Sequence, residues 1–114
     1  MIRPAKLSDI KALNALNKNE MGYDFPLEDA RQQLALILAD SEHHVLAVFE
    51  DEQSSAVRGY IHAELYREIY AEDAFNLLAL AVDSSQQGQG IGSALHCWHG
   101  WKRKRSSVAS IQFA

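Results

Sequence analysis

The chain has 114 residues, of which 47% are hydrophobic and 23% are charged, and its formal net charge is −4. This length and composition predict a single globular domain over residues 1–114 and exclude a mainly disordered chain. No apolar run approaches the ~18 residues of a membrane span, so we expect no membrane association. The single cysteine, Cys97, cannot form an internal disulfide, which favours a reducing, cytoplasmic location.

The charge is unevenly distributed along the chain. Residues 1–100 carry a net −8 and residues 101–114 carry +4, because the last acidic residue is Asp83 and four bases follow as Lys102–Arg105. The overall acidity argues against nucleic-acid binding by the body of the domain, so we expect no nucleic-acid partner. The basic run Lys102–Arg105 is most simply a solvated helix end, where cations also favour the helix dipole, and nucleic-acid binding by this run alone is the alternative.

Hydrophobic periodicity predicts an α/β fold, or α+β in stricter usage, with the order β-α-α-β-β-β-α-β. In the first part of the chain we expect a strand end at 1–3, a helix over 8–19 capped by Ser8, a loop over 17–26 and a helix from 26 to about 40. Strands over 44–50 and 57–65, joined by a loop, come next, followed by an irregular connection over 66–74 and a strand over 75–82. A loop over 83–89, a helix from 91 to about 103 and a strand over 108–113 complete the order. The apolar run 75–82 is typical of a central strand covered on both faces. We expect the sheet to be mostly antiparallel and flanked by helices.

The strongest signal follows that strand. Gly88, Gly90 and Gly92 alternate in the loop that leads into the third helix. The first turn of a helix has unpaired N–H groups and a partial positive charge, and glycine lets an anion approach the backbone closely. The loop therefore predicts a phosphate-binding turn.

Two common phosphate motifs do not fit this loop. A P-loop needs a lysine directly after its last glycine, and none is present. A dinucleotide-binding turn needs a third glycine where Ser93 stands, and it comes near the front of a βαβ unit rather than after 82 residues. The spacing that does fit is Q-x-x-G-x-G at Gln87, Gly90 and Gly92.

This motif, preceded by Leu80–Asp83, resembles the acetyl-CoA-binding motif of the GNAT family of N-acetyltransferases. Ile2–Ala5 with Ser8–Ile10, and Gly59–Ile61, resemble the family's first strand and helix and its third strand. The resemblance covers about residues 1–95. It implies an acetyl-CoA-dependent transfer of an acetyl group to a primary amine of a small molecule or peptide.

The resemblance also assigns roles to residues. Backbone N–H groups of residues 88–93 would hold the pyrophosphate of coenzyme A, while backbone groups of Leu80 and Val82 would pair with the pantetheine arm and polarise the thioester. The expected cofactor-binding residues are Leu80, Ala81, Val82, Gln87, Gly88, Gln89, Gly90, Ile91, Gly92 and Ser93. The basic run Lys102–Arg105 would lie near the 3′-phosphate in one alternative. No metal is implied.

Family members continue after the third helix with a strand, a helix and two more strands, and this chain has room for one strand only. We therefore expect a C-terminally short domain. One alternative is a second copy of the chain, in a homodimer, that completes the sheet. Another is a degenerate member that binds coenzyme A or a partner without catalysis.

The acceptor site is expected between the loop 17–26 and the strand region 62–76. This lining is acidic and aromatic, which suits a cationic amine, and a carboxylate is the natural base to deprotonate it. Its members are Glu20, Tyr23, Asp24, Phe25, Glu64, Tyr66, Glu68, Tyr70, Glu72 and Asp73. Glu64 is the predicted catalytic base, because its strand should run beside the central one.

Three further candidates have simpler explanations. Cys97 is expected to be a packed or exposed cysteine rather than a nucleophile. His96 and His99 share a helical spacing but lack a third metal ligand. His43 and His44 point to opposite faces of a strand, which favours a chance pairing.

Overall fold

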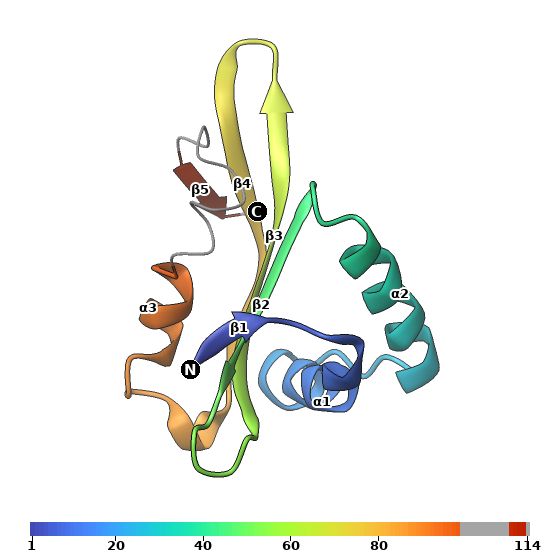
Figure 1. The fold of residues 1–114 in the computed structure, drawn as a ribbon, viewed down its shortest axis with the longest axis vertical. Helices are drawn as coiled ribbons and strands as arrows, with labels where there is room; N and C mark the ends of the chain where they lie inside the picture. Colours follow the sequence, from blue (N-terminus) through green and yellow to red (C-terminus); the bar gives the residue numbers. More distant parts are fainter. Residues whose placement is uncertain (99–109, 114) are drawn as a thin grey trace.

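The computed structural model describes residues 1–98 and 110–113, and their order of elements is the predicted one (Figure 1). The strands are β1 (Ile2–Pro4), β2 (His44–Glu50), β3 (Val57–Glu68), β4 (Ala71–Val82) and β5 (Ser110–Phe113); the helices are α1 (Ile10–Met21), α2 (Leu27–Ala39) and α3 (Ile91–His96), with short 3-10 helices at Leu7–Asp9 and Ser84–Gln86. None of the helices described is long and apolar enough to cross a bilayer.

The strands form one five-stranded sheet in the order β1-β2-β3-β4-β5. Neighbouring strands from β1 to β4 are antiparallel, and β5 runs parallel to β4. Helices α1 and α2 cover one face, and α3 lies against the other (Figure 1). The sequence prediction of a mostly antiparallel sheet flanked by helices is confirmed.

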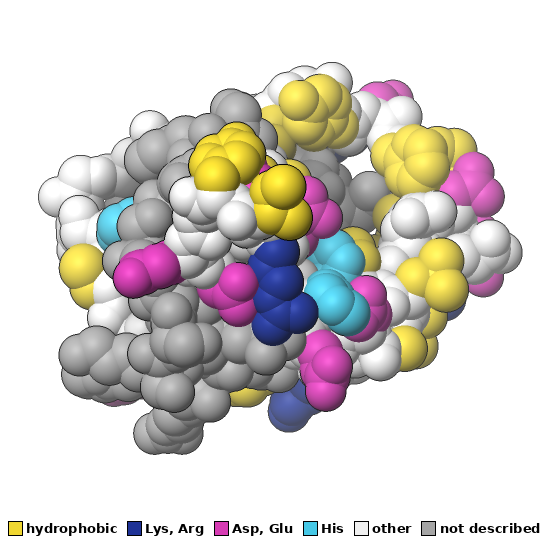
Figure 2. Space-filling view, turned by 90° about the horizontal axis from the view of Figure 1, so that it is seen from above, with side chains coloured by type: hydrophobic (Ala, Val, Ile, Leu, Met, Phe, Trp, Pro, Cys, Tyr) yellow, Lys and Arg dark blue, Asp and Glu magenta, His cyan; other side chains and the backbone are white. Residues whose placement is uncertain are grey.

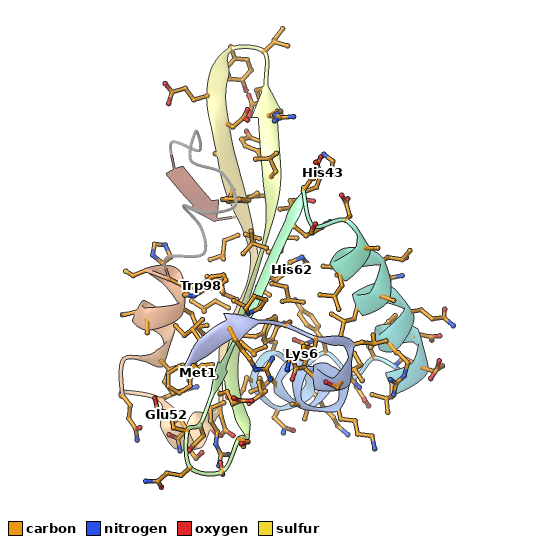
Figure 3. All side chains as sticks on the ribbon, in the orientation of Figure 1. Met1, Lys6, His43, Glu52, His62 and Trp98 are labelled. Atoms are coloured by element: carbon orange, nitrogen blue, oxygen red, sulfur yellow. The ribbon has the colours of Figure 1, made fainter. Side chains whose placement is uncertain are left out.

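Each face of the sheet has its own core, because successive strand side chains point to opposite faces. On the α3 face, Ile61 and Phe75 pack with Leu95. On the α1–α2 face, Tyr60 and Val48 pack with residues of both helices, among them Leu13, Leu16 and Leu34. The labelled side chains of Figure 3 show the same division, with Trp98 on the α3 side of the sheet and His62 on the α1–α2 side.

The connection predicted as irregular over 66–74 is instead a continuation of the hairpin. Strand β3 runs to Glu68, the chain turns at Ile69 and Tyr70, and β4 starts at Ala71. An ion pair between Arg67 Nε and Asp73 Oδ2 at 3.0 Å links the two strands near the tip. The charged residues in 66–74 were interpreted as a loop, but an extended hairpin can also carry charges where its faces reach solvent. Figure 2 looks onto this end, where acidic, basic and hydrophobic side chains alternate.

The strand 75–82 is covered less completely than predicted. Phe75, Leu77 and Ala81 are buried, but Leu78 and Leu80 are 40% and 37% exposed. The prediction of a strand buried on both faces is therefore wrong for its second half.

Helix boundaries also differ from the prediction. The first α-helix begins at Ile10 rather than Ser8, because the Asp9 N–H donates to the Lys6 carbonyl at 3.0 Å and closes a 3-10 turn first. The Asp9 carboxylate also accepts the Lys6 N–H at 2.8 Å. The helix ends at Met21 and is capped by Gly22, which has a left-handed φ of 76°. The third helix ends at His96, so its predicted extension through Trp98 is wrong, and the remainder of that prediction lies outside the described residues.

Candidate functional site

The outer edge of β4 is the first feature of the site. Strand β3 pairs with β4 along nearly its whole length, from Val82 to Ala71. Strand β5 covers only residues 74–77 on the other side. Within the part of the chain that the structure describes, the edge from Leu78 to Val82 therefore has no strand beside it. An unpaired strand edge of this kind can accept an extended ligand.

A β-bulge lies where this open edge begins. His62 on β3 pairs with Ala79, and the next residue, Ala63, pairs with Leu77, so Leu78 has no partner on β3. Such a bulge bends its strand and redirects the groups that follow it. The bulge thus separates the half of β4 that β5 covers from the half that is open.

The backbone groups of Leu80 and Val82 point away from β3, toward the open edge. The Asp83 N–H donates to the Arg58 carbonyl at 2.8 Å, and the groups of successive residues alternate in an antiparallel pair. The Gln87 side chain confirms the direction, since its Nε2 donates to the Val82 carbonyl at 3.2 Å. The two residues predicted to meet the pantetheine arm thus face the open edge, with Ala81 between them.

The glycine loop has a backbone that requires its glycines at two positions. Gly88 and Gly90 have φ of 84° and 81°, values that residues with a side chain rarely adopt. Gly90 caps α3, and the first intrahelical bond joins the Ala94 N–H to its carbonyl at 2.9 Å. The N–H groups of residues 91–93 therefore precede the helical ladder and are available to an anion.

A surface hollow of about 370 Å³ lies over this loop. It is lined by Val82, Gln86, Gln87, Gly88, Gly90, Ile91, Gly92 and Ser93, which include most of the predicted cofactor residues, whereas Gln89 lines a neighbouring hollow. None of these described lining residues is charged. From these residues, an anion in the hollow would meet backbone N–H groups and the helix dipole.

Glu20 at the end of α1 ties the loop to the rest of the fold. Its Oε2 accepts the Ser84 N–H at 3.0 Å, and its Oε1 accepts a bond from Gln87 Nε2 at 3.4 Å. Asp83 caps the same turn by accepting the Ser85 N–H at 3.0 Å, and hydrogen bonds from Ser85 hold the pKa of Asp83 below its usual value. These contacts fix the loop between β4 and α1.

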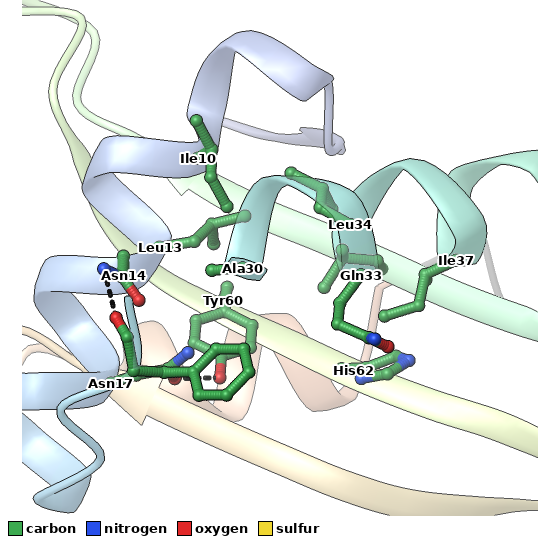
Figure 4. Close-up of a pocket in the computed structure, with 12 residues that line it drawn as sticks. Ile10, Leu13, Asn14, Asn17, Ala30, Gln33, Leu34, Ile37, Tyr60 and His62 are labelled. Carbon is green, nitrogen blue, oxygen red and sulfur yellow. Dashed lines mark hydrogen bonds between the residues drawn. The ribbon is translucent and has the colours of Figure 1, made fainter. Parts of the chain in front are cut away.

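A cavity of about 200 Å³ lies between α1, α2 and the sheet (Figure 4). The polar groups at its wall come from Asn14, Asn17, Gln33, Tyr60 and His62, and the rest of the lining comes from Ile10, Leu13, Phe25, Ala30, Leu34, Ile37 and Leu46. Phe25 is 49% exposed and Gln33 is also exposed, so they stand at the mouth. Tyr60 donates its hydroxyl proton to Asn17 Oδ1.

His62 lines this cavity and contacts a second histidine. Its Nε2 lies 3.0 Å from His44 Nδ1, and the ring centroids are 5.1 Å apart. Burial, with a smaller contribution from His44, lowers the pKa of His62 to about 4. In the strand register His62 faces Ala79, directly beside the bulge. A neutral imidazole is thus held next to the point where the β4 edge opens.

Glu64, the predicted base, is half-buried two residues further along the same face of β3. It is opposite His44 on β2 and Asn76 on β4, within the stretch that β5 covers. The predicted acceptor lining is not brought together as expected. Phe25 lies at the cavity mouth and Glu20 at the glycine loop, whereas residues 66–73 belong to the far end of the hairpin (Figure 1).

The remaining sequence candidates, Cys97 and the His96–His99 pair, form no metal or nucleophile site among the described residues. Cys97 is exposed and free. No group of three or more potential metal ligands occurs among residues 1–98, and His99 and Lys102–Arg105 lie outside the described residues. The sequence reasoning missed His62. The only available signal was its place in the alternating strand 57–65, and the cross-strand register that joins it to His44 cannot be read from the sequence.

The strand order, the bulged β4 and the glycine turn into α3 place the chain among acetyltransferase folds. Residues 10–96 match the profile of the Acetyltransferase (GNAT) family, and the chain belongs to this family. The resemblance seen in the glycine motif is therefore confirmed. No curated protein sequence gives a significant match.

Solved structures share the fold over the whole chain. A transcriptional regulator from Bacillus halodurans C-125 superposes with a TM-score of 0.83 at 19% identity, covering 100% of this chain and 80% of that one. A GNAT family acetyltransferase from Staphylococcus aureus gives 0.80 at 20% identity, covering 100% and 84%. Glucosamine-6-phosphate N-acetyltransferase from Arabidopsis thaliana gives 0.77 at 19% identity, covering 100% and 80%. Identities this low establish the fold alone.

Proposed function

We propose that this chain is an acetyl-CoA-dependent N-acetyltransferase that acts on a primary amine of a small molecule or peptide. Family membership supports acetyl transfer in general. The observation that carries the specific proposal is the open edge of β4, where the outward backbone groups of Leu80 and Val82 lie directly before the glycine loop. An extended arm on that edge would end with its phosphates at the start of α3.

The described residues fit such a ligand. Bound acetyl-CoA would supply an activated thioester, whose carbonyl carbon is the electrophile for an amine. Leu80 and Val82 would orient the pantetheine arm through backbone hydrogen bonds, and the Gln87 amide would exchange its bond to the Val82 carbonyl for one to the ligand. N–H groups of residues 91–93 would hold the pyrophosphate.

A base must remove the proton of the acceptor amine before or during attack. Glu64 stays the predicted base. The structure adds His62 as a second candidate, because its register partner Ala79 is the first residue beyond the bulge, whereas the partner of Glu64, Asn76, lies within the covered stretch. Both side chains project from β3 toward the face of α1 and α2.

The decisive experiment incubates the full chain with acetyl-CoA and a panel of amines and measures release of free thiol. Gly92→Asp is the informative variant. An acidic residue is favourable in the first turn of a helix, so the fold should persist, while its charge repels the pyrophosphate. Gly92→Ala is the matched control, since its Cβ would lie 3.8 Å from Val82 Cγ2, an ordinary contact.

We expect thiol release by the natural chain and by Gly92→Ala, and little by Gly92→Asp. If acetyl-CoA raises the melting temperature but no amine releases thiol, the chain is a binding module and the catalytic proposal is wrong. If acetyl-CoA has no effect on melting, the cofactor assignment is also wrong. The homodimer stays part of the proposal and predicts twice the chain mass on a sizing column; a monomer contradicts it.

A further inference from the structure

Two imidazole rings meet across strands β2 and β3. His44 Nδ1 lies 3.0 Å from His62 Nε2, and the rings are tilted by 32° with their centroids 5.1 Å apart. This contact is a hydrogen bond when one of the two nitrogens carries a proton and the other does not. It occupies one nitrogen of each ring, so His62 Nδ1 and His44 Nε2 are the nitrogens left for other partners.

The two rings stand in different surroundings, although both are half-buried. His62 lines the cavity between α1, α2 and the sheet, where its ring lies beside Gln33 (Figure 4). The other titratable residue described in that lining is Tyr60, whose pKa burial raises to about 12. His44 also lines a second hollow, of about 270 Å³, which reaches Trp98. The pair therefore connects the cavity beside the β4 bulge with a separate hollow at the start of β2.

A positive charge has counter-charges at one end of this pair and none at the other. No Asp, Glu, Lys or Arg occurs among the described residues that line the His62 cavity, and burial lowers the pKa of His62 to about 4. Two carboxylates face His44 instead. Glu64 is its register partner on β3, and a hydrogen bond from His43, together with attraction to His44, lowers the pKa of Asp40. A proton that reaches the pair is therefore held better on His44 than on His62.

We propose that His62 and His44 form a proton relay that carries the ammonium proton of the acceptor out of the cavity, with His44 as a positioning residue. The relay rests on the proposed function and on its second base candidate, His62. His62 Nδ1 takes a proton from the ammonium while the proton on its Nε2 passes to His44 Nδ1. His62 thus stays neutral, and the charge appears on His44, which releases a proton to water.

The remaining steps balance without another reactant. A primary amine is mainly protonated at neutral pH and has no lone pair for attack until this proton leaves. The neutral amine then forms a C–N bond to the thioester carbonyl carbon, and the C–S bond breaks. A second amine proton goes to the leaving thiolate. Each turnover therefore releases one proton, which is the proton that the relay carries.

The first test measures which nitrogens carry protons in the natural chain, by ¹⁵N–¹H correlation spectra of the imidazole rings without acetyl-CoA. We expect a proton on His62 Nε2 and none on His62 Nδ1 or His44 Nδ1. A proton on His62 Nδ1 would overturn the inference, because that nitrogen could not accept a proton from the amine. This measurement needs neither a substrate nor a variant.

The second test compares variants in the thiol-release assay. In His44→Asn the amide oxygen can accept a hydrogen bond from His62 Nε2 but cannot take over its proton. We expect kcat at neutral pH to fall about 10²-fold with KM unchanged, because general base catalysis contributes roughly 10²–10⁴-fold. The kcat of this variant should rise steadily with pH, as hydroxide replaces the relay. His43→Asn is the matched control and should keep the natural kcat, since the His43 ring is 53% exposed and contacts Asp40.

Added imidazole distinguishes a lost base from a lost contact. His44→Ala should lose kcat as His44→Asn does and regain part of it with imidazole, up to a saturating concentration, because the free base can enter the space of the missing ring. Imidazole should not raise the kcat of His44→Asn or His43→Asn. If His44→Ala does not fold, the proton positions in the natural chain still decide between the two directions of the hydrogen bond.

The relay and the proposed function fail in different ways. A natural kcat in His44→Asn, combined with a loss in Glu64→Gln, would overturn the relay and leave the proposed function standing. A loss in His44→Ala that is absent in His44→Asn would also overturn it, because His44 would then only hold the His62 ring. Absence of thiol release by the natural chain from every amine would remove the proposed function, and the relay with it.

Discussion

Replacing Gly59 with alanine should loosen α3 from the sheet. A Cβ at this position would lie 3.0 Å from the Ala81 carbonyl oxygen, 3.2 Å from Ile91 Cγ2 and 3.4 Å from Leu95 Cδ1. The first contact is with backbone, which cannot rotate away, so the helix or β4 must shift by a few tenths of an ångström. Overpacking of a core typically costs about 1–3 kcal/mol. For a domain of this size that lowers the melting temperature by roughly 4–12 °C.

Differential scanning fluorimetry of Gly59→Ala against the natural chain measures the effect, with Gly92→Ala as the control for an added methyl group in the same region. Titration with coenzyme A should also show weaker binding, because the displaced elements are the two that flank the glycine loop. A melting temperature within a degree of the natural chain, or a loss as large in Gly92→Ala, would show that close packing of α3 on β3 does not require glycine here.

Four further outcomes follow from the described residues. Gly90→Ala should lose about 1–2 kcal/mol of unfolding free energy by denaturant titration, because its φ of 81° is left-handed while its Cβ would meet nothing within 4 Å; an unchanged midpoint would contradict the strain argument. The ion pair with Arg3 at 2.8 Å lowers the pKa of Asp9, so the natural chain should lose stability as the pH falls below ~4. The variant Asp9→Asn should be less stable near neutral pH and should not show this acid-induced loss. The pKa of His62 is about 4 in the folded chain and ~6.5 in an unfolded chain, so the free energy of unfolding should fall as the pH drops from ~6.5 to ~4, by at most ~1.4 kcal/mol per pH unit. Melting measured over this pH range should show a smaller slope for His62→Gln. Glu64→Gln should depress turnover at neutral pH if Glu64 is the base, and an unchanged pH–rate profile would leave His62 as the remaining candidate.

Local patterns were sufficient to predict the order of elements and the glycine turn between β4 and α3. Strand β2 was predicted with its observed bounds, since it is a short β-rich run between a helix end and a polar loop. The glycine loop was predicted because residues 82–93 carry both the motif and its structural setting in one continuous segment. Both signals depend only on neighbours in the sequence.

Features that depend on register were not predicted. The bulge at Leu78 arises from how β4 pairs with β3, and the apolar run 75–82 reads the same with or without it. The cavity forms only where α1, α2 and β3 come together in the fold. The acidic residues around 66–73 were predicted to lie near the acceptor because they are close to β3 residues in the sequence, but they lie at the far end of the hairpin. The hairpin places those charges away from the cavity, so the acidic residues of 66–73 are not gathered around it.

Helix α1 joins the two halves of the site. Asn14 and Asn17 face the cavity, and Glu20, one further turn along, holds Ser84 and Gln87 of the glycine loop. The spacing of three residues keeps all three side chains on neighbouring positions of one helical surface. A shift of α1 that accommodates a guest in the cavity would therefore move Glu20 as well. The Gln87 side chain, which contacts Glu20 and donates to the Val82 carbonyl, would move with it. The cavity and the glycine loop beside the β4 edge thus share one helix.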